Sequence, residues 1–201
     1  MRLLALVLMC WALSAGAVER VSVCYNYGCL AQSVVEISDE RLAEVGRLLH
    51  ETTDAEGERA AIARIVGRML GWAAEQTPIG ADRGGNYADE GVYGRMDCID
   101  HSTTTTRLLR LIEAKGMLRF HHVLDPALRR RFLLFEHYSA LIEERKPGSS
   151  DCGCDGETEA DPSKQFVVDS WFFDNGQAAT VMPLARWISG ESPGESPNEN
   201  E

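Results

Sequence analysis

Three residues of the sequence have the types that a cysteine-dependent catalytic triad needs, in the order Cys98, His137 and Asp169. The thiolate is the reactive form of cysteine, and a thiol with an ordinary pKa is mostly protonated at neutral pH. An imidazole can take the thiol proton, and a carboxylate can fix the imidazole tautomer and stabilise its charged form. Such a set would perform acyl transfer, in which the sulfur attacks an amide or ester carbonyl and forms a thioester.

The segment "GRMDCIDHSTTTTRLLRLIEAKG" predicts a helix from about Cys98 to Lys115 that is closed by Gly116. The unpaired N–H groups and the dipole at a helix N-terminus favour a thiolate. The flanking carboxylates of Asp97 and Asp100 oppose it, and we expect Asp97 to cap the helix. An imidazole must therefore supply the remaining activation.

Of the five histidines, His137 is the best partner for the cysteine, because it lies in a predicted strand that can face the helix. His50 ends an amphipathic helix and is expected at the surface. His101 is too close to the cysteine on the same helix to leave room for a substrate. His121 and His122 follow the helix at a link where at most one of them would face inward.

The segments "RFLLFEHYSALIEE" and "KQFVVDSWFF" are both predicted strands, separated by an acidic, turn-rich insert. If they form an antiparallel hairpin, paired residue numbers have a constant sum. A sum of about 306 would place His137 opposite Asp169 and Glu143 opposite Ser163. That register would bring the imidazole and the carboxylate together.

The remaining elements must position these residues. Alternation predicts short strands at 21–25 and 33–37, and helical spacing predicts two amphipathic helices at 39–51 and 59–76. Residues 77–96 are rich in glycine and polar residues and predict a long loop, which in a small domain is often functional. The expected fold class is α+β, with the cysteine helix packed on an antiparallel sheet that carries His137 and Asp169, and with helices preceding both.

The motifs resemble a known superfamily. "DCIDHSTTTTRLLRLIEAKGM" resembles the cysteine-bearing helix of papain-like and transglutaminase-like enzymes, "HYSALIEE" their histidine strand and "FVVDSWF" their aspartate strand. The nearest group is the bacterial transglutaminase-like cysteine proteinases, and the resemblance covers about residues 92–188. The chain departs from the pattern at Tyr138 and Ser139, where the family commonly has a tryptophan, and in its long, cysteine-bearing insert at 145–164.

The resemblance implies that Cys98 is the nucleophile, His137 the general base and acid, and Asp169 the orienting carboxylate. The backbone N–H of the cysteine would form half of the oxyanion hole. Trp171 would shield the contact between imidazole and carboxylate from water. The candidates for the second oxyanion donor lie upstream in the loop: Asn86, Tyr87 and Tyr93.

The chain opens with "MRLLALVLMCWALSAGAVER", in which a basic residue and an apolar run precede small residues. This pattern predicts a signal peptide over 1–17 that is cleaved after Ala17. The run is shorter than the about 20 residues of a permanent membrane span. We therefore expect an exported protein, periplasmic or secreted, with one transglutaminase-like domain over 18–188 and a disordered acidic tail over 189–201.

Five cysteines remain after the expected cleavage, and an exported protein normally pairs its cysteines. Cys98 has no near companion and is the expected free thiol. The other four allow three pairings, and bridges between the two close pairs are at least as plausible as a strained bridge within Cys-Gly-Cys. The disulfide candidates are Cys24, Cys29, Cys152 and Cys154.

The formal charge of -11 argues against a nucleic-acid partner, which needs a clustered basic surface. The densest basic cluster, Arg129 to Arg131, is expected on a solvated helix face. Capping explains the acids beside Cys98, and the cysteine spacings do not match usual zinc knuckles. No metal or cofactor is expected.

The expected activity is hydrolysis of an amide bond in a peptide, a protein or a cell-wall peptide, since nothing in the sequence marks a site for an amine acceptor. An alternative keeps the fold without the catalysis. In that case the protein is an exported binding or scaffolding module that uses the same cleft.

Overall fold

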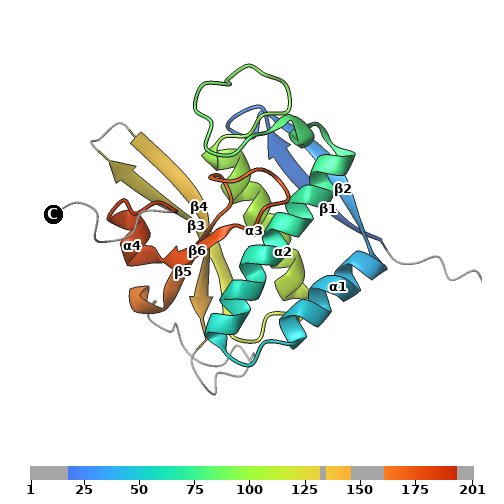
Figure 1. The fold of residues 1–201 in the computed structure, drawn as a ribbon, viewed down its shortest axis with the longest axis vertical. Helices are drawn as coiled ribbons and strands as arrows, with labels where there is room; N and C mark the ends of the chain where they lie inside the picture. The colour runs from blue at the N-terminus through green and yellow to red at the C-terminus, as the bar shows by residue number, and fades with distance from the viewer. Residues whose placement is uncertain (1–17, 132–134, 146–160, 194–201) are drawn as a thin grey trace, which may run out of the picture.

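Two antiparallel sheets and the helices packed against them make up the part of the chain that the computed structural model describes, residues 18–131, 135–145 and 161–193 (Figure 1). The first sheet pairs β1 (Val18–Tyr25) with β2 (Ala31–Ser38). The second has the order β3-β4-β5-β6, with the bounds β3 (His121–Arg131), β4 (Phe135–Glu144), β5 (Gln165–Asp169) and β6 (Thr180–Pro183). The predicted α+β class is confirmed.

The three longer α-helices each begin at a side chain that caps them. The α-helices are α1 (Asp39–His50), α2 (Ala55–Gln76), α3 (Cys98–Ala114) and the short α4 (Leu184–Ile188), and 3-10 turns lie at Pro78–Ala81 and Pro162–Lys164. Ser38, Asp54 and Asp97 each accept a backbone N–H in the first turn of the helix that follows. Gly116 ends α3 with a φ of 67°, which glycine adopts without a steric penalty.

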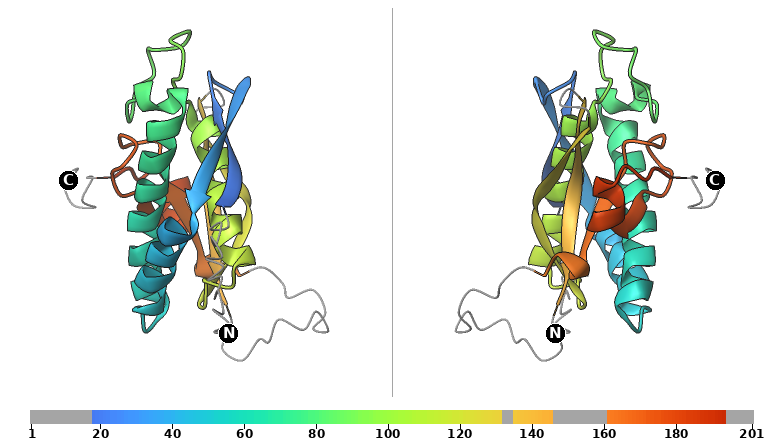
Figure 2. Two further views of the ribbon diagram at one scale, coloured as in Figure 1. Left: turned by 90° about the vertical axis from the view of Figure 1, so that its right-hand side faces the viewer. Right: turned by 90° about the vertical axis from the view of Figure 1, so that its left-hand side faces the viewer.

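Helices α2 and α3 both contact the two sheets, and α3 does so most extensively. Helix α3 contacts β1 of the first sheet and β3, β4 and β5 of the second. Edge-on views show α2 along one side of the molecule and α3, β3 and β4 along the other (Figure 2). The residue at the start of α3 is therefore placed by both sheets.

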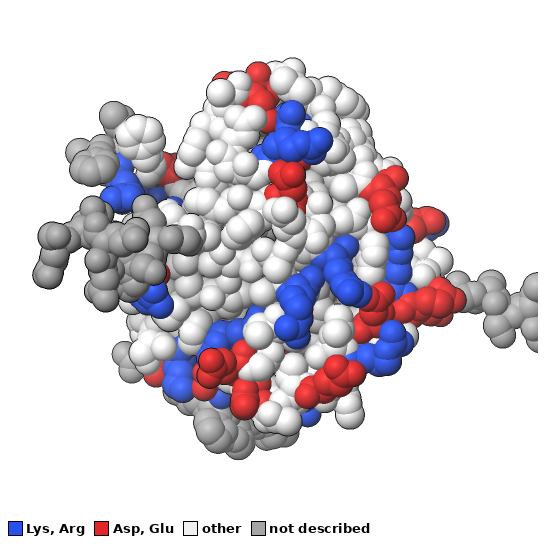
Figure 3. Space-filling model, viewed as in Figure 1, with Lys and Arg blue, Asp and Glu red and all other residues white. Residues whose placement is uncertain are grey.

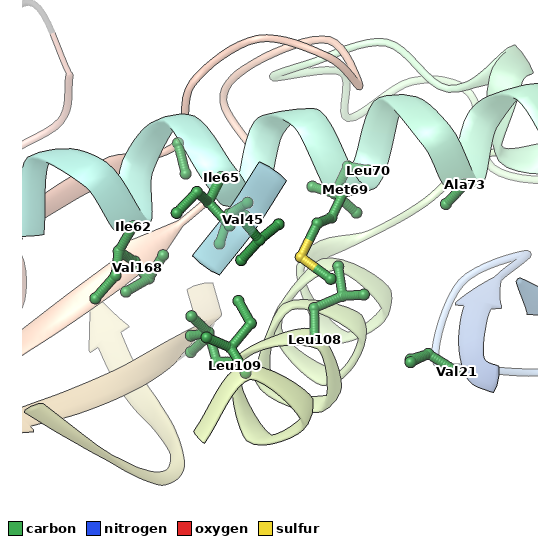
Figure 4. Close-up of a cluster of buried hydrophobic side chains, with 14 of the residues drawn as sticks. Val21, Val45, Ile62, Ile65, Met69, Leu70, Ala73, Leu108, Leu109 and Val168 are labelled. Carbon is green, nitrogen blue, oxygen red and sulfur yellow. The ribbon is translucent and has the colours of Figure 1, made fainter. Parts of the chain in front are cut away.

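The core lies between α2, α3 and β5 (Figure 4). Helix α2 contributes Ile62, Ile65 and Met69, and α3 contributes Leu108, Leu109 and Ile112, all with no exposed surface. Their spacing of three and four residues places each set on one helix face. The predicted amphipathic helices are confirmed as packing elements.

The strand β3 was not expected, and the predicted solvated helix face for Arg129 to Arg131 is wrong. These residues lie in β3, and Arg129 is buried. Asp125 and Pro126 interrupt the alternation that identifies a strand, and they fall where the pairing with β4 is irregular. The strand therefore carries a weak sequence signal.

The predicted hairpin pairing of β4 with β5 forms, but its register differs by two residues from the expected one. Glu143 pairs with Gln165 rather than Ser163, which lies in a 3-10 turn. A shift of two residues returns every side chain to the same face of the sheet, because the side-chain period is two. His137 and Asp169 therefore remain on one face as diagonal neighbours.

Some predictions fall on residues outside the described part: the signal peptide at 1–17, Cys152 and Cys154, and the end of the tail at 194–201. Beyond the predicted domain end at residue 188 the chain still packs on the fold. The N–H of Glu191 donates to the carbonyl of Arg186, and Arg129 donates to the carbonyl of Glu191. Among the described helices, none is long and apolar enough to cross a membrane.

Acidic and basic side chains alternate over the face formed by α1 and α2 (Figure 3). Ion pairs join the two helices there, between Arg41 and Glu75 at 2.7 Å and between Arg68 and Glu44. This face carries no concentrated positive charge of the kind that binds a phosphate backbone.

We predict that Leu109→Ala lowers the free energy of unfolding by about 2 to 5 kcal/mol, because it leaves a cavity in the core. The matched control is Leu30→Ala, since Leu30 is 85% exposed where Leu109 is 0% exposed, and it should change stability by less than about 0.5 kcal/mol. Urea denaturation of the oxidised proteins measures both values. Equal losses in the two variants would contradict the placement of α3 in the core.

Candidate active site

A cavity of about 610 Å³ lies at the N-terminus of α3 and brings together parts of the chain that are distant in sequence. Cys98 and His137 both line it. Much of the remaining wall is aromatic, from Tyr27, Tyr87, Phe135, Trp171 and Phe172. A concave, largely apolar site with a few polar groups is the usual form of a ligand site.

His137 and Asp169 form a buried pair at the floor of this site. His137 Nε2 donates to Asp169 Oδ2 at 2.8 Å. Because the carboxylate holds the proton on Nε2, the other ring nitrogen, Nδ1, is left to act as a base. This arrangement matches the predicted roles of the two residues.

Two tryptophans hold the Asp169 carboxylate in place. Trp187 Nε1 donates to Asp169 Oδ2 at 2.9 Å, and the backbone N–H of Trp171 donates to Oδ1 at 3.3 Å. The sequence predicted a shielding role for Trp171, whose ring centroid lies 5.3 Å from that of His137. Trp187 was missed, because it lies on the unpredicted α4.

Cys98 is the first residue of α3 and a half-buried free thiol. Burial raises the pKa of the Cys98 thiol above its usual value, and the carboxylates of Asp97 and Asp169 raise it further. The backbone N–H groups of Tyr138 and of Cys98 itself act in the opposite direction. The resting site therefore favours the neutral thiol, so that activation must come from transfer of its proton to a base.

Asp97 and Asp100 form the cap at the start of α3. The Asp97 Oδ1 accepts the Asp100 N–H at 2.8 Å, and the Asp100 Oδ2 accepts the Asp97 N–H at 3.2 Å. This reciprocal pair is a capping box. The predicted capping role of Asp97 is confirmed.

The same two carboxylates bind the turn between β1 and β2. Asp100 accepts two of its backbone N–H groups and Asp97 accepts a third, from Tyr27 at 2.8 Å, Cys29 at 2.7 Å and Gly28 at 2.9 Å. A disulfide between Cys24 and Cys29 closes this turn. The start of α3 is thus tied to a covalently closed loop.

The disulfide settles one pairing that the sequence left open. Because Cys24 bonds to Cys29, a bridge from either of them to Cys152 or Cys154 does not form. Cys98 is free, as predicted. The two bridged sulfurs lie near a carboxylate, but sulfurs in a disulfide are not thiolate ligands, so this group is not a metal site.

The three oxyanion candidates differ in position. Asn86 and Tyr87 line the cavity, but the side-chain amide of Asn86 donates to Asp89 at 3.0 Å and the Tyr87 ring packs on Trp171. Tyr93 is 65% exposed and packs against another tyrosine rather than in the cavity. The backbone N–H of the cysteine remains the expected donor.

A second polar chain, which was not predicted from the sequence, lies buried behind the site. His101 Nε2 donates to Asp82 Oδ2 at 3.0 Å, and the Ser170 hydroxyl lies 3.0 Å from His101 Nδ1. All three side chains are at most 5% exposed. They join the 77–96 loop, α3 and the residue after Asp169, so they fix the relative position of these segments.

The other histidines do not line the cavity. His121 is fully buried, with Nδ1 at 2.8 Å from Glu58, whereas His122 is half-buried and His50 is exposed. The expectations that at most one of His121 and His122 faces inward and that His50 lies at the surface are confirmed.

We predict that Asp100 makes stability depend on pH between about 4 and 6. Burial, together with the nearby Asp97 charge, raises the pKa of Asp100 from 3.8 to about 6. The folded state therefore binds the proton more tightly than the unfolded state, and this stabilisation is present below about pH 4 and lost as pH rises through about 6. The difference in unfolding free energy between wild type and Asp100→Asn should fall across that range by about 1 to 3 kcal/mol.

Denaturant titrations at a series of pH values measure this difference. Leu30→Ala, which changes an exposed side chain with no titratable group, is the control and should give a difference that does not change with pH. A flat difference for Asp100→Asn as well would contradict the assignment to this buried carboxylate.

Comparisons with protein-family models, with curated proteins and with solved structures find no match to this chain. The resemblance to transglutaminase-like enzymes therefore remains a prediction from the sequence motifs. What the structure adds is the geometry around Cys98, His137 and Asp169.

Proposed function

We propose that the protein is an exported, cysteine-dependent acyl-transfer enzyme of transglutaminase-like type that hydrolyses an amide bond in a peptide, a protein or a cell-wall peptide. One observation carries the proposal: Cys98 and His137 line one cavity, and His137 is bonded to the buried Asp169. A thiol, a base and an orienting carboxylate are the parts that such a reaction requires.

The proposed reaction has two steps. Cys98 Sγ attacks the substrate carbonyl while His137 Nδ1 takes the thiol proton, and the carbon–nitrogen bond breaks as His137 gives that proton to the leaving amine. Water then attacks the thioester, His137 takes a proton from the water, and this proton returns to the sulfur as the acid product leaves. Asp169 holds the imidazole in position through both steps.

The surroundings of the pair support this role. The ring centroids of Trp171, Phe172 and Trp187 lie between 5.3 and 5.7 Å from that of His137. These rings exclude water from the imidazole and limit its rotation. Electrostatic interactions within such a site are stronger than in bulk water.

The disulfide supports export of the protein to an oxidising compartment. Disulfides persist in oxidising compartments and are rare where thiols are kept reduced. The Cys24–Cys29 bond, together with the predicted signal peptide at 1–17, supports a periplasmic or secreted location.

The binding-module alternative has one observation in its favour. The pKa of the Cys98 thiol is raised by burial and by two carboxylates, so the resting thiol is a poor nucleophile. In that reading the aromatic cavity binds a peptide and no bond is broken. The reactivity of Cys98 separates the two functions.

We predict that iodoacetamide labels native Cys98 well below the usual thiol pKa of about 8.5, and that His137→Ala slows this labelling at least about tenfold at pH 6.5, because His137 takes the thiol proton as the sulfur attacks the reagent. Mass spectrometry assigns the label to Cys98. His50→Ala, at an exposed histidine, is the control and should react like wild type.

A labelling rate that rises only near the usual thiol pKa in both wild type and His137→Ala would contradict the enzyme proposal. The protein would then be assigned as a binding module. A normal unfolding transition in His137→Ala ensures that the comparison concerns the site and not the fold.

A further inference from the structure

Arg129 occupies an unusual place in the cavity wall. It lies in β3 directly opposite His137 of β4, and it lines the cavity together with Cys98. Directly opposed residues of antiparallel strands have their Cβ atoms about 5 Å apart, so the guanidinium belongs to the immediate surroundings of the proposed base. Only 9% of Arg129 is exposed.

The bonds that hold Arg129 leave its charge without an ion pair. Its Nη1 donates to the carbonyls of Trp187 at 2.9 Å and Glu191 at 3.2 Å, and the guanidinium lies over the Trp187 ring at 4.8 Å. Among the described residues, no carboxylate lies within ion-pair distance of it. A guanidinium has five N–H donors, and burying a charge without a counter-ion is costly.

The acidic groups around the cavity already have partners of their own. Glu136 pairs with Arg130 at 2.7 Å, Asp97 accepts backbone N–H groups on both oxygens, and Asp169 accepts from His137 and Trp187. Burial lowers the pKa of Arg129, and the Asp169 carboxylate, which acts on it from beyond ion-pair distance, offsets only part of this effect. A bound anion would compensate this charge without displacing an existing ion pair.

We propose that the cavity selects an acyl donor that carries a carboxylate next to the scissile carbonyl, as an acidic peptide does, and that Arg129 binds this carboxylate. The inference rests on the proposed function, because it names the substrate class of the same site. Guanidinium and carboxylate are complementary in shape and form charge-assisted hydrogen bonds. The aromatic walls would then contact the rest of the peptide.

Iodoacetate and iodoacetamide test the proposal, because they are similar in size and differ in having a carboxylate or a neutral amide. The measured quantity is the rate constant for labelling Cys98 with iodoacetate divided by that with iodoacetamide. This ratio is then divided by the same ratio for Cys98 in the denatured protein. We expect this normalised ratio to be about tenfold or more in the native wild type, since hydrogen bonds to charged groups contribute about 1.5 to 3 kcal/mol. A ratio of one or below in the wild type overturns the proposal.

Variants assign the preference to a residue. Arg129→Gln should return the ratio to about one, and Arg129→Lys should retain part of it, because lysine keeps the charge without the fork. Arg110→Gln, which removes an equal charge at an exposed position paired with Asp125, is the matched control and should leave the ratio unchanged. A ratio that survives Arg129→Gln but falls in His137→Ala would assign the preference to the imidazolium and overturn the proposal.

The labelling results distinguish failure of the carboxylate selectivity from failure of the proposed function on which it rests. If Cys98 labelling is activated and depends on His137 but shows no preference for iodoacetate, only the carboxylate selectivity fails. If labelling is not activated at low pH, the enzyme proposal fails whatever the ratio. Should Arg129→Gln not fold after losing its bonds to Trp187 and Glu191, the wild-type ratio and Arg129→Lys still decide the question.

Discussion

The site depends on the hydrogen bonds by which two carboxylates satisfy the backbone N–H groups at the start of α3 and in the neighbouring turn. Asp97 and Asp100 cap each other's backbone and also accept three N–H groups of the β1–β2 turn. Cys98 stands between these acids, so the bonds that fix its position also place a negative charge beside its sulfur. Burial and the Asp97 charge both lower the acidity of the thiol placed in this way, so the proposed catalysis depends on a separate base.

The proposed base, His137, belongs to the second sheet, and α3 contacts both sheets. The helix buries hydroxyls on both sides: Thr104 accepts the backbone N–H of Cys24, and Thr105 bonds to Ser170 at 3.0 Å. Two threonines of the run at 103–106 thus tie the cysteine helix to β1 and to the residue that follows β5, whereas the buried hydroxyl of Thr106 has no hydrogen-bond partner among the described residues. Polar contacts of this kind fix relative positions more specifically than apolar packing, because an unpaired buried hydroxyl is costly.

Local patterns in the sequence predicted the elements that carry the site. The start of α3 and its cap at Asp97, the free Cys98 and the pairing of the strands bearing His137 and Asp169 follow from capping rules, cysteine counting and alternation. The β4–β5 register was off by two residues because the insert between the strands has no fixed length rule. Strand β3 was missed because its local pattern is interrupted, whereas the buried chain through His101 and the anchoring of Asp169 by Trp187 were missed because they depend on contacts between distant segments.

The position of the Asp100 carboxylate also affects how readily the neighbouring disulfide is reduced. One of its oxygens lies within 4.8 Å of the sulfurs of both Cys24 and Cys29. Reduction of a disulfide begins with the approach of a thiolate anion, which a carboxylate at this distance repels. Cys24 is also fully buried, so its sulfur offers no path of attack. The cross-link is therefore shielded on the side of Cys24, and a thiolate that attacks the half-buried Cys29 meets two opposing charges, the Asp100 carboxylate and the Arg107 guanidinium, which lies 3.4 Å from the Cys24 sulfur.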